Sequence, residues 1–166
     1  MTKIIGVDPG CPLAIGSLDT TTGPIATYTD DAVAAQIVKA GRKSASWVNQ
    51  VSLITAILRA EQPDLVLIER VSLRPNESLS AGIPFVGSMF LVEGICSGLR
   101  LRYKLVPPNV WKPALGIKVS LKNPKEPARI RALETWPDKA SMFARKKDHN
   151  IAEALLLAHY GATEGL

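Results

Sequence analysis

Four acidic residues stand at the ends of apolar segments, where a buried hydrophobic residue or a simple cap would be the ordinary choice. They are Asp8, Glu69, Asp148 and Glu153. Carboxylates brought to one place repel one another and raise one another's pKa, unless a cation offsets their charge. Oxygen ligands suit Mg²⁺ or Mn²⁺. If the fold gathers these residues, we expect a divalent-metal site with two ions about 4 Å apart, which promote in-line displacement at a phosphodiester.

The first acid, Asp8, ends the apolar run Ile-Ile-Gly-Val and is followed at once by Pro9-Gly10. The run predicts a short buried strand, and the Pro-Gly pair predicts a tight turn. On this segment alone, a turn-capping role for Asp8 is an equally simple interpretation. The pattern recurs at residues 65–69, where Leu-Val-Leu-Ile predicts a strand that is buried on both faces and ends in Glu69.

The remaining segments predict the rest of an α/β fold. Further strands are expected at residues 13–18, 24–29 and 101–106. Helices are expected at residues 46–62, 79–99, 109–116, 126–136 and 148–160, the third of them capped by Asn109. Three meandering strands followed by alternating helices and strands indicate a mixed five-stranded sheet flanked by helices. We expect residues 1–166 to form one domain, because the sequence has no internal repeat or linker.

The last two acids are five residues apart at the start of the helix expected at residues 148–160. Five residues correspond to about 140° around an ideal helix. Asp148 and Glu153 therefore converge only if Asp148 precedes the first turn, in an N-cap position. Alternatively, His149 or Asn150 takes the first role, four or three residues before Glu153. A plain cap at Asp148 and an exposed histidine at position 149 are the structural alternatives.

Positive charge is concentrated in one part of the chain. The net charge is +5 at pH 7, but residues 100–147 hold 13 Lys and Arg against 3 Asp and Glu. The rest of the chain is net negative. Such asymmetry is typical of a surface that binds a phosphate backbone. An acidic metal site beside a basic surface indicates a nuclease or polynucleotidyl transferase.

Composition argues against several other classes of protein. The two cysteines, Cys11 and Cys96, make neither a disulfide framework nor a zinc-site spacing. Residues 79–99 are apolar, but Pro84 and Glu93 interrupt them, so we interpret them as a buried or interface helix instead of a membrane anchor. No secretory leader is recognisable. A cytoplasmic protein with no membrane partner is the expectation.

Three segments resemble the acidic motifs of RuvC-type Holliday junction resolvases, members of the ribonuclease H-like (retroviral integrase) superfamily. They are Gly-Val-Asp-Pro-Gly at residues 6–10, Leu-Ile-Glu-Arg-Val at residues 67–71, and Asp-His with Ala-Glu-Ala-Leu-Leu-Leu-Ala at residues 148–149 and 152–158. Lys146-Lys147-Asp148 also resembles the phage-encoded and mitochondrial branches. A phage-encoded protein would act in the host cytoplasm. The resemblance covers residues 4–160 and implies a ribonuclease H-like fold.

The resemblance implies a metal-dependent endonuclease that acts as a homodimer in DNA recombination and repair. Each subunit would nick one of two opposed strands of a four-way DNA junction, leaving 5′-phosphate and 3′-hydroxyl ends. Asp8 and Glu69 would hold the metal ions, and the acids of the last helix would complete the site. The basic residues expected to contact the junction are Arg74, Lys112, Lys118, Lys122 and Lys125.

Other residues have simpler interpretations. Trp111 and Trp136 are expected to be core anchors instead of base-stacking platforms. Gly87, Gly94 and Gly98 suit close helix approach, which makes the helix at residues 79–99 the candidate dimer interface, with an intramolecular core helix as the alternative.

Three other functions are alternatives to junction resolution. A related ribonuclease H-like nuclease would act on other branched DNA or on RNA, since a basic groove does not distinguish these substrates. A junction-binding module without catalysis would explain the irregular last motif. An actin-like phosphotransferase also opens with a strand, Asp and Gly, but it needs a second half-domain and a further glycine-rich phosphate loop that this chain lacks.

Overall fold

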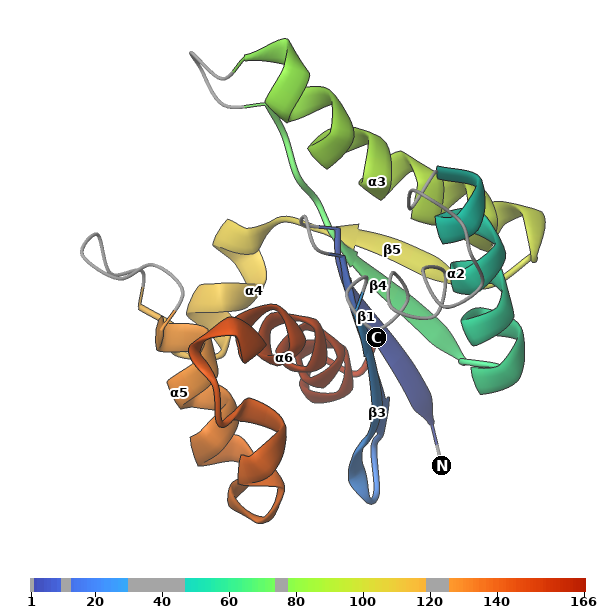
Figure 1. The fold of residues 1–166 in the computed structure, drawn as a ribbon. Coiled ribbons are helices and arrows are strands. Elements are labelled where there is room, and N and C mark those ends of the chain that lie inside the picture. The colour runs from blue at the N-terminus through green and yellow to red at the C-terminus, as the bar shows by residue number, and fades with distance from the viewer. Residues whose placement is uncertain (1, 10–12, 30–46, 74–77, 119–125) are drawn as a thin grey trace.

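The computed structural model describes residues 2–9, 13–29, 47–73, 78–118 and 126–166 (Figure 1). Its centre is a five-stranded sheet with the order β3-β2-β1-β4-β5. The strands are β1 (Lys3–Asp8), β2 (Ala14–Asp19), β3 (Gly23–Thr29), β4 (Leu65–Glu69) and β5 (Tyr103–Val106). The first three form an antiparallel meander, whereas β1, β4 and β5 run parallel. The predicted mixed five-stranded sheet is confirmed.

Helices cover both faces of this sheet. They are α2 (Trp47–Glu61), α3 (Leu79–Gly98), α4 (Pro108–Ala114), α5 (Glu126–Thr135) and α6 (His149–Thr163), with the short 3₁₀ helices η1 (Pro137–Phe143) and η2 (Lys146–Asp148). In Figure 1, α2 and α3 lie on one side of the sheet, and α6 lies on the other with α4 and α5 beside it. No helix in the described ranges is long and apolar enough to cross a membrane.

The central strands are buried on both faces, as their continuous apolar sequences predict. In β1, Ile5 and Val7 pack into the hydrophobic cluster with α2 and α3, whereas Ile4 belongs to the cluster around α6. In β4, Val66 and Ile68 face the first cluster, and Leu65 and Leu67 face the second. This alternation follows from the two-residue period of a strand, and it leaves β1 and β4 shielded from water on both faces.

The same period decides which way Asp8 and Glu69 point. Asp8 has the parity of Ile4, and Glu69 has the parity of Leu67, so both carboxylates lie on the α6 side of the sheet. The parallel register pairs Val7 with Ile68. The next residue of each strand is an acid, so Asp8 and Glu69 lie side by side at the C-terminal ends of β1 and β4.

Two glycines let α6 lie directly on the sheet. A Cβ atom at Gly6 would stand 1.9 Å from the carbonyl oxygen of Ala154, and one at Gly16 would stand 2.8 Å from the side chain of Leu155. Any larger residue in β1 at this point would push the helix away. Contact at Ala154 also fixes the neighbouring residue, Glu153, close to the strand that ends in Asp8.

The structure differs from the sequence predictions at several helix ends. Helix α4 begins at Pro108 with Pro107 in the N-cap position, so the predicted cap at Asn109 is wrong. Pro108 occupies the first helical position. Proline is favoured at that position because its fixed φ suits the first turn and its missing N–H needs no partner. Between the helices predicted at residues 126–136 and 148–160, the chain forms the 3₁₀ helix η1. Cys11 lies outside the described residues.

Candidate metal centre

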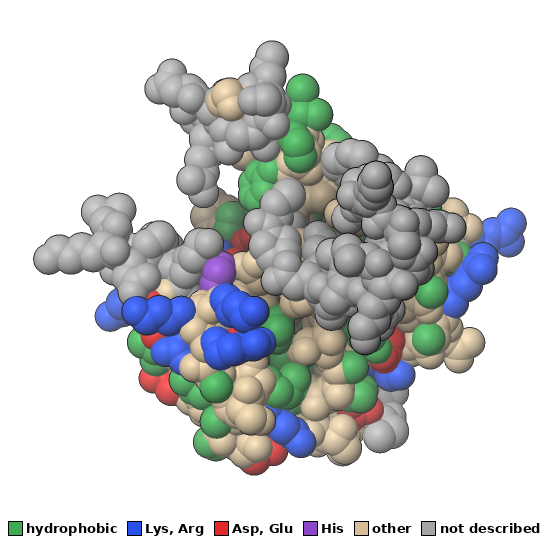
Figure 2. Space-filling model, in the orientation of Figure 1, with side chains coloured by type: hydrophobic (Ala, Val, Ile, Leu, Met, Phe, Trp, Pro, Cys, Tyr) green, Lys and Arg blue, Asp and Glu red, His purple; other side chains and the backbone are tan. Residues whose placement is uncertain are grey.

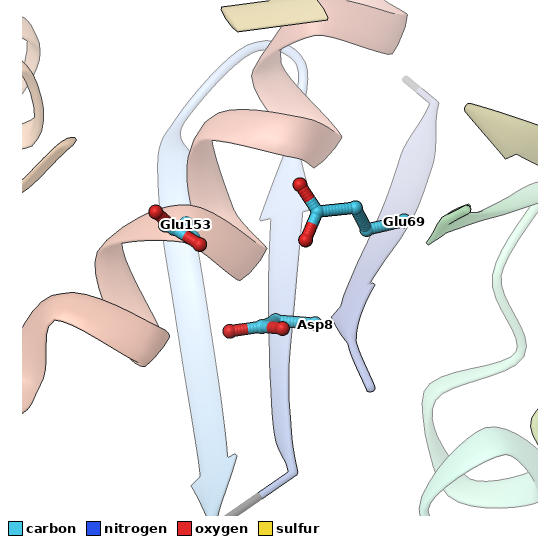
Figure 3. A group of neighbouring side chains, drawn as sticks. All are labelled: Asp8, Glu69 and Glu153. Atoms are coloured by element: carbon cyan, nitrogen blue, oxygen red, sulfur yellow. The ribbon is translucent and has the colours of Figure 1, made fainter. Parts of the chain in front are cut away.

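Three carboxylates from three different elements meet at one edge of the sheet. Asp8 comes from the end of β1, Glu69 from the end of β4 and Glu153 from the second turn of α6 (Figure 3). One oxygen atom of each lies within 4.8 Å of the others. Asp8 and Glu69 are each 7% exposed, and the side chain of Glu153 is 14% exposed. The structure thus brings together three of the four acids that the sequence singles out.

Lys112 of α4 is the basic residue of this cluster. Its Nζ atom lies 3.0 Å from Oε1 of Glu153 and 3.4 Å from Oε1 of Glu69. Burial lowers the pKa of Lys112, but the nearby charges of Glu153 and Glu69 outweigh burial and keep this pKa above its ordinary value. Lys112 is therefore a charged ammonium in contact with the acids. From the sequence, Lys112 is expected only to contact the DNA phosphates.

Trp111 supports both Glu69 and Lys112. The indole is fully buried, as expected for a core anchor. Its Nε1 atom donates a hydrogen bond of 3.2 Å to Oε1 of Glu69, and the ammonium of Lys112 stands 5.1 Å from the centre of a Trp111 ring. The indole N–H orients one carboxylate, while the ring attracts the cation beside it. The sequence carries no signal for the first of these contacts, because the two residues are 42 positions apart.

Without a metal ion, the surroundings of Glu69 disfavour its ionisation relative to water. Burial raises the pKa of Glu69, the charge of Lys112 lowers it, and the charge of Glu153 raises it again; the net pKa lies above the ordinary value. Three carboxylates and one ammonium leave an excess of two negative charges in a poorly solvated place. A divalent cation would offset this excess of negative charge.

Asp148 is not part of this group. It occupies the N-cap position of α6, as one predicted alternative requires, but its carboxylate turns back to Arg145. The backbone N–H of Arg145 donates to Oδ2 at 2.8 Å, and the guanidinium donates to Oδ1 at 2.8 Å. Burial raises the pKa of Asp148, but the hydrogen bonds and charge of Arg145 outweigh burial and hold this pKa below its ordinary value. Asp148 is thus an ionised residue that fixes the start of α6.

The other predicted site residues have different positions. Nδ1 of His149 lies 3.1 Å from the carbonyl oxygen of Lys146, and His149 does not belong to the acidic group. Asn150 is half-buried and precedes Glu153 by three residues, which places the two on the same face of α6. Lys118 is exposed. The positions of Arg74, Lys122 and Lys125 lie outside the described residues.

The donor set fits a hard divalent cation. Mg²⁺ and Mn²⁺ prefer oxygen ligands and accept a few carboxylates while keeping water molecules for a phosphate substrate. Asp8, Glu69 and Glu153 supply oxygen atoms from rigid elements, at the carboxyl edge of parallel strands. Among the residues that the structure describes, no cysteine or histidine belongs to the group. This composition does not favour zinc, which is usually bound by sulfur and nitrogen.

A basic surface lies near the start of α6. Lys and Arg side chains gather over α5 and η2 in Figure 2. They include the exposed Arg145, Lys146 and Lys147, together with the less exposed Arg129 and Arg131. Arg145 is also the partner of Asp148, so the basic surface continues directly into the segment that holds α6 in place.

Comparison with known proteins identifies the fold. No protein-family model and no curated protein sequence matches this chain. A structure of Thermus thermophilus RuvC in complex with a Holliday junction substrate matches with a TM-score of 0.64 and 15% identity, over 99% of this chain and 97% of that chain. A second Thermus thermophilus RuvC structure matches with a TM-score of 0.59 and 18% identity, over 98% and 96% of the two chains. The chain therefore has the RuvC fold, as its motifs predict.

Proposed function

We propose that this chain is one nuclease domain, a structure-selective, divalent-metal-dependent endonuclease that resolves four-way DNA junctions by paired symmetric nicks. The observation that carries the proposal is the meeting of Asp8, Glu69 and Glu153 at one buried edge of a RuvC-type sheet. The basic surface over α5 and η2 supports it, because a phosphate backbone needs such a surface beside an acidic site. The RuvC structure with a Holliday junction substrate suggests the class of DNA.

The chain's own residues have distinct tasks in this mechanism. Asp8, Glu69 and Glu153 would hold Mg²⁺ or Mn²⁺, and we assign the fourth ligand position to Asn150, on the same face of α6 as Glu153. The bound metal would polarise the phosphodiester and lower the pKa of the attacking water. Trp111 keeps Glu69 in position through its indole N–H. The bond between Asp148 and Arg145 fixes the helix that carries Glu153.

Two nicks in opposed strands require two active sites, and we propose that α3 joins two copies of the chain. Ile83, Gly87, Phe90 and Gly94 follow one another at spacings of four, three and four, which places them on one face of the helix. Ile83 and Phe90 are each 59% exposed, and a Cβ atom at Gly94 would meet nothing within 4 Å. Exposed apolar residues beside glycines suit close contact with a second helix.

Light scattering tests the dimer. The proposed interface predicts a dimer for the wild type and a monomer for Phe90→Asp. A wild type that is monomeric at assay concentration, or a Phe90→Asp variant that stays dimeric, would contradict this interface without affecting the proposed metal site.

Cleavage of matched substrates tests the proposed activity. A four-way junction, a linear duplex and an RNA–DNA hybrid of the same sequence are incubated with Mg²⁺, Mn²⁺ or EDTA. We expect symmetric nicks in the junction alone, only with metal, and none with Asp8→Asn, which should still bind the junction. Cleavage of duplex or hybrid instead of junction would indicate a related ribonuclease H-like nuclease. Binding of the junction without cleavage by the wild type would indicate a non-catalytic module.

A further inference from the structure

We infer that the ammonium group of Lys112 is the counter-ion of the metal-free site, and that a divalent ion binds there by displacing it. The inference rests on the proposed metal-dependent function and adds a competition between Lys112 and the metal. One lysine would then serve two states: it offsets part of the negative charge of the acids before the metal arrives and is free to contact a DNA phosphate afterwards.

The contacts of Lys112 coincide with the contacts that a metal ion needs. Its Nζ atom lies 3.0 Å from Oε1 of Glu153 and 3.4 Å from Oε1 of Glu69, and both carboxylates belong to the acidic group. An ion on these oxygens would be a direct neighbour of the ammonium. The side chains of Lys112, Glu69 and Glu153 are only 18%, 9% and 14% exposed, so water and salt screen the repulsion between the two cations weakly.

The backbone around Lys112 is fixed, so the side chain has to move. The neighbouring Trp111 is fully buried, and the carbonyl oxygen of Lys112 accepts a hydrogen bond of 2.9 Å from the N–H of Ile117. The flexible four-carbon stem of lysine allows the ammonium to swing out while α4 stays in place. Because the side chain is already partly exposed, a short movement brings the ammonium toward the solvent side of the site.

Isothermal titration calorimetry with Mg²⁺ tests the competition. Lys112→Met removes the charge and keeps a similar length, so its Mg²⁺ dissociation constant should be about tenfold lower than that of the wild type. The matched control is Lys139→Met, which removes a half-buried lysine paired with Asp138 and should bind Mg²⁺ like the wild type. An unchanged or higher dissociation constant for Lys112→Met would overturn the inference. If Lys112→Met folds only with metal, the counter-ion role is supported.

A measurement on the wild type avoids any effect of the substitution on folding. In protein labelled at lysine ¹³Cε, the Lys112 signal is identified by its absence from Lys112→Arg. Saturation with Mg²⁺ should shift this signal and leave that of Lys139 unchanged, whereas a stationary Lys112 signal during proven metal binding would refute displacement. If Mg²⁺ and Mn²⁺ bind neither the wild type nor Lys112→Met, the proposed metal-dependent function fails as well. If junction cleavage needs metal but Lys112 does not respond, only the exchange fails.

Discussion

Neutralising Glu69 should stabilise the metal-free protein while it abolishes cleavage. Glu69→Gln keeps the size of the side chain and an oxygen that accepts the hydrogen bond from Trp111, but it removes one negative charge from the cluster. Ionised Glu69 is unfavourable in the metal-free site, because burial and Glu153 raise its pKa more than Lys112 lowers it. If Glu69 had only a structural role, Glu69→Gln would instead destabilise the metal-free protein.

The size of the effect follows from the distances. With an effective dielectric constant near 20, the two repulsions that Glu69 has with Asp8 and Glu153 over at most 4.8 Å cost about 3.5 kcal/mol each. The attraction to Lys112 at 3.4 Å returns about 4.9 kcal/mol on the same scale. The variant should therefore gain roughly 2 kcal/mol, which corresponds to a rise in melting temperature of about 4–8 °C for a chain of this size.

Thermal unfolding in EDTA and in increasing Mg²⁺ measures this effect. In EDTA, Glu69→Gln should melt above the wild type. At a Mg²⁺ concentration of about 100 times the dissociation constant, the wild type gains about 2.7 kcal/mol and should overtake the variant, which has lost a ligand. A Glu69→Gln protein that melts below the wild type in EDTA, or gains as much from Mg²⁺, would refute the assignment of Glu69 to the metal centre.

Three further predictions concern the start of α6, its packing on β1, and a side-chain pair that joins β3 to α2. Asp148→Asn should lower the free energy of unfolding by about 1–2 kcal/mol, because a charged hydrogen bond is lost. Since the folded pKa of Asp148 lies below its ordinary value, the difference from wild type in urea titrations should be full above pH 3.8 and disappear as the pH falls below 3.8 and through the lower folded pKa. Gly6→Ala should cost about 1–3 kcal/mol in the free energy of unfolding and reduce cleavage, because its Cβ would force α6 away from β1. The hydrogen bond to Glu61 raises the pKa of Tyr28 to about 12, so its stabilisation should be full below pH 10 and fade toward pH 12, and Glu61→Gln should move tyrosinate absorbance to lower pH.

The sequence predicts the sheet half of the site well, because local patterns control it. An apolar run with an acid at its end specifies a buried strand, and the parallel strands β1 and β4 then bring Asp8 and Glu69 to the same edge. The two-residue period also places both on one face. These features depend only on nearby residues and on the rules of sheet packing, so the fold and two of the acids follow from the sequence.

The helix half depends on contacts that no local pattern contains. From spacing alone, Asp148, His149 and Asn150 are all candidates for the position beside Glu153. In the structure, Arg145 binds Asp148, and this ion pair fixes the start of α6. Asp148 is therefore turned away from Glu153. Gly6 then allows α6 to approach β1 closely at Ala154. This contact determines which carboxylate of the helix reaches Asp8. The acid that completes the site is therefore selected by tertiary packing, and a charge removed from Asp148 or from Glu69 should change stability in opposite directions.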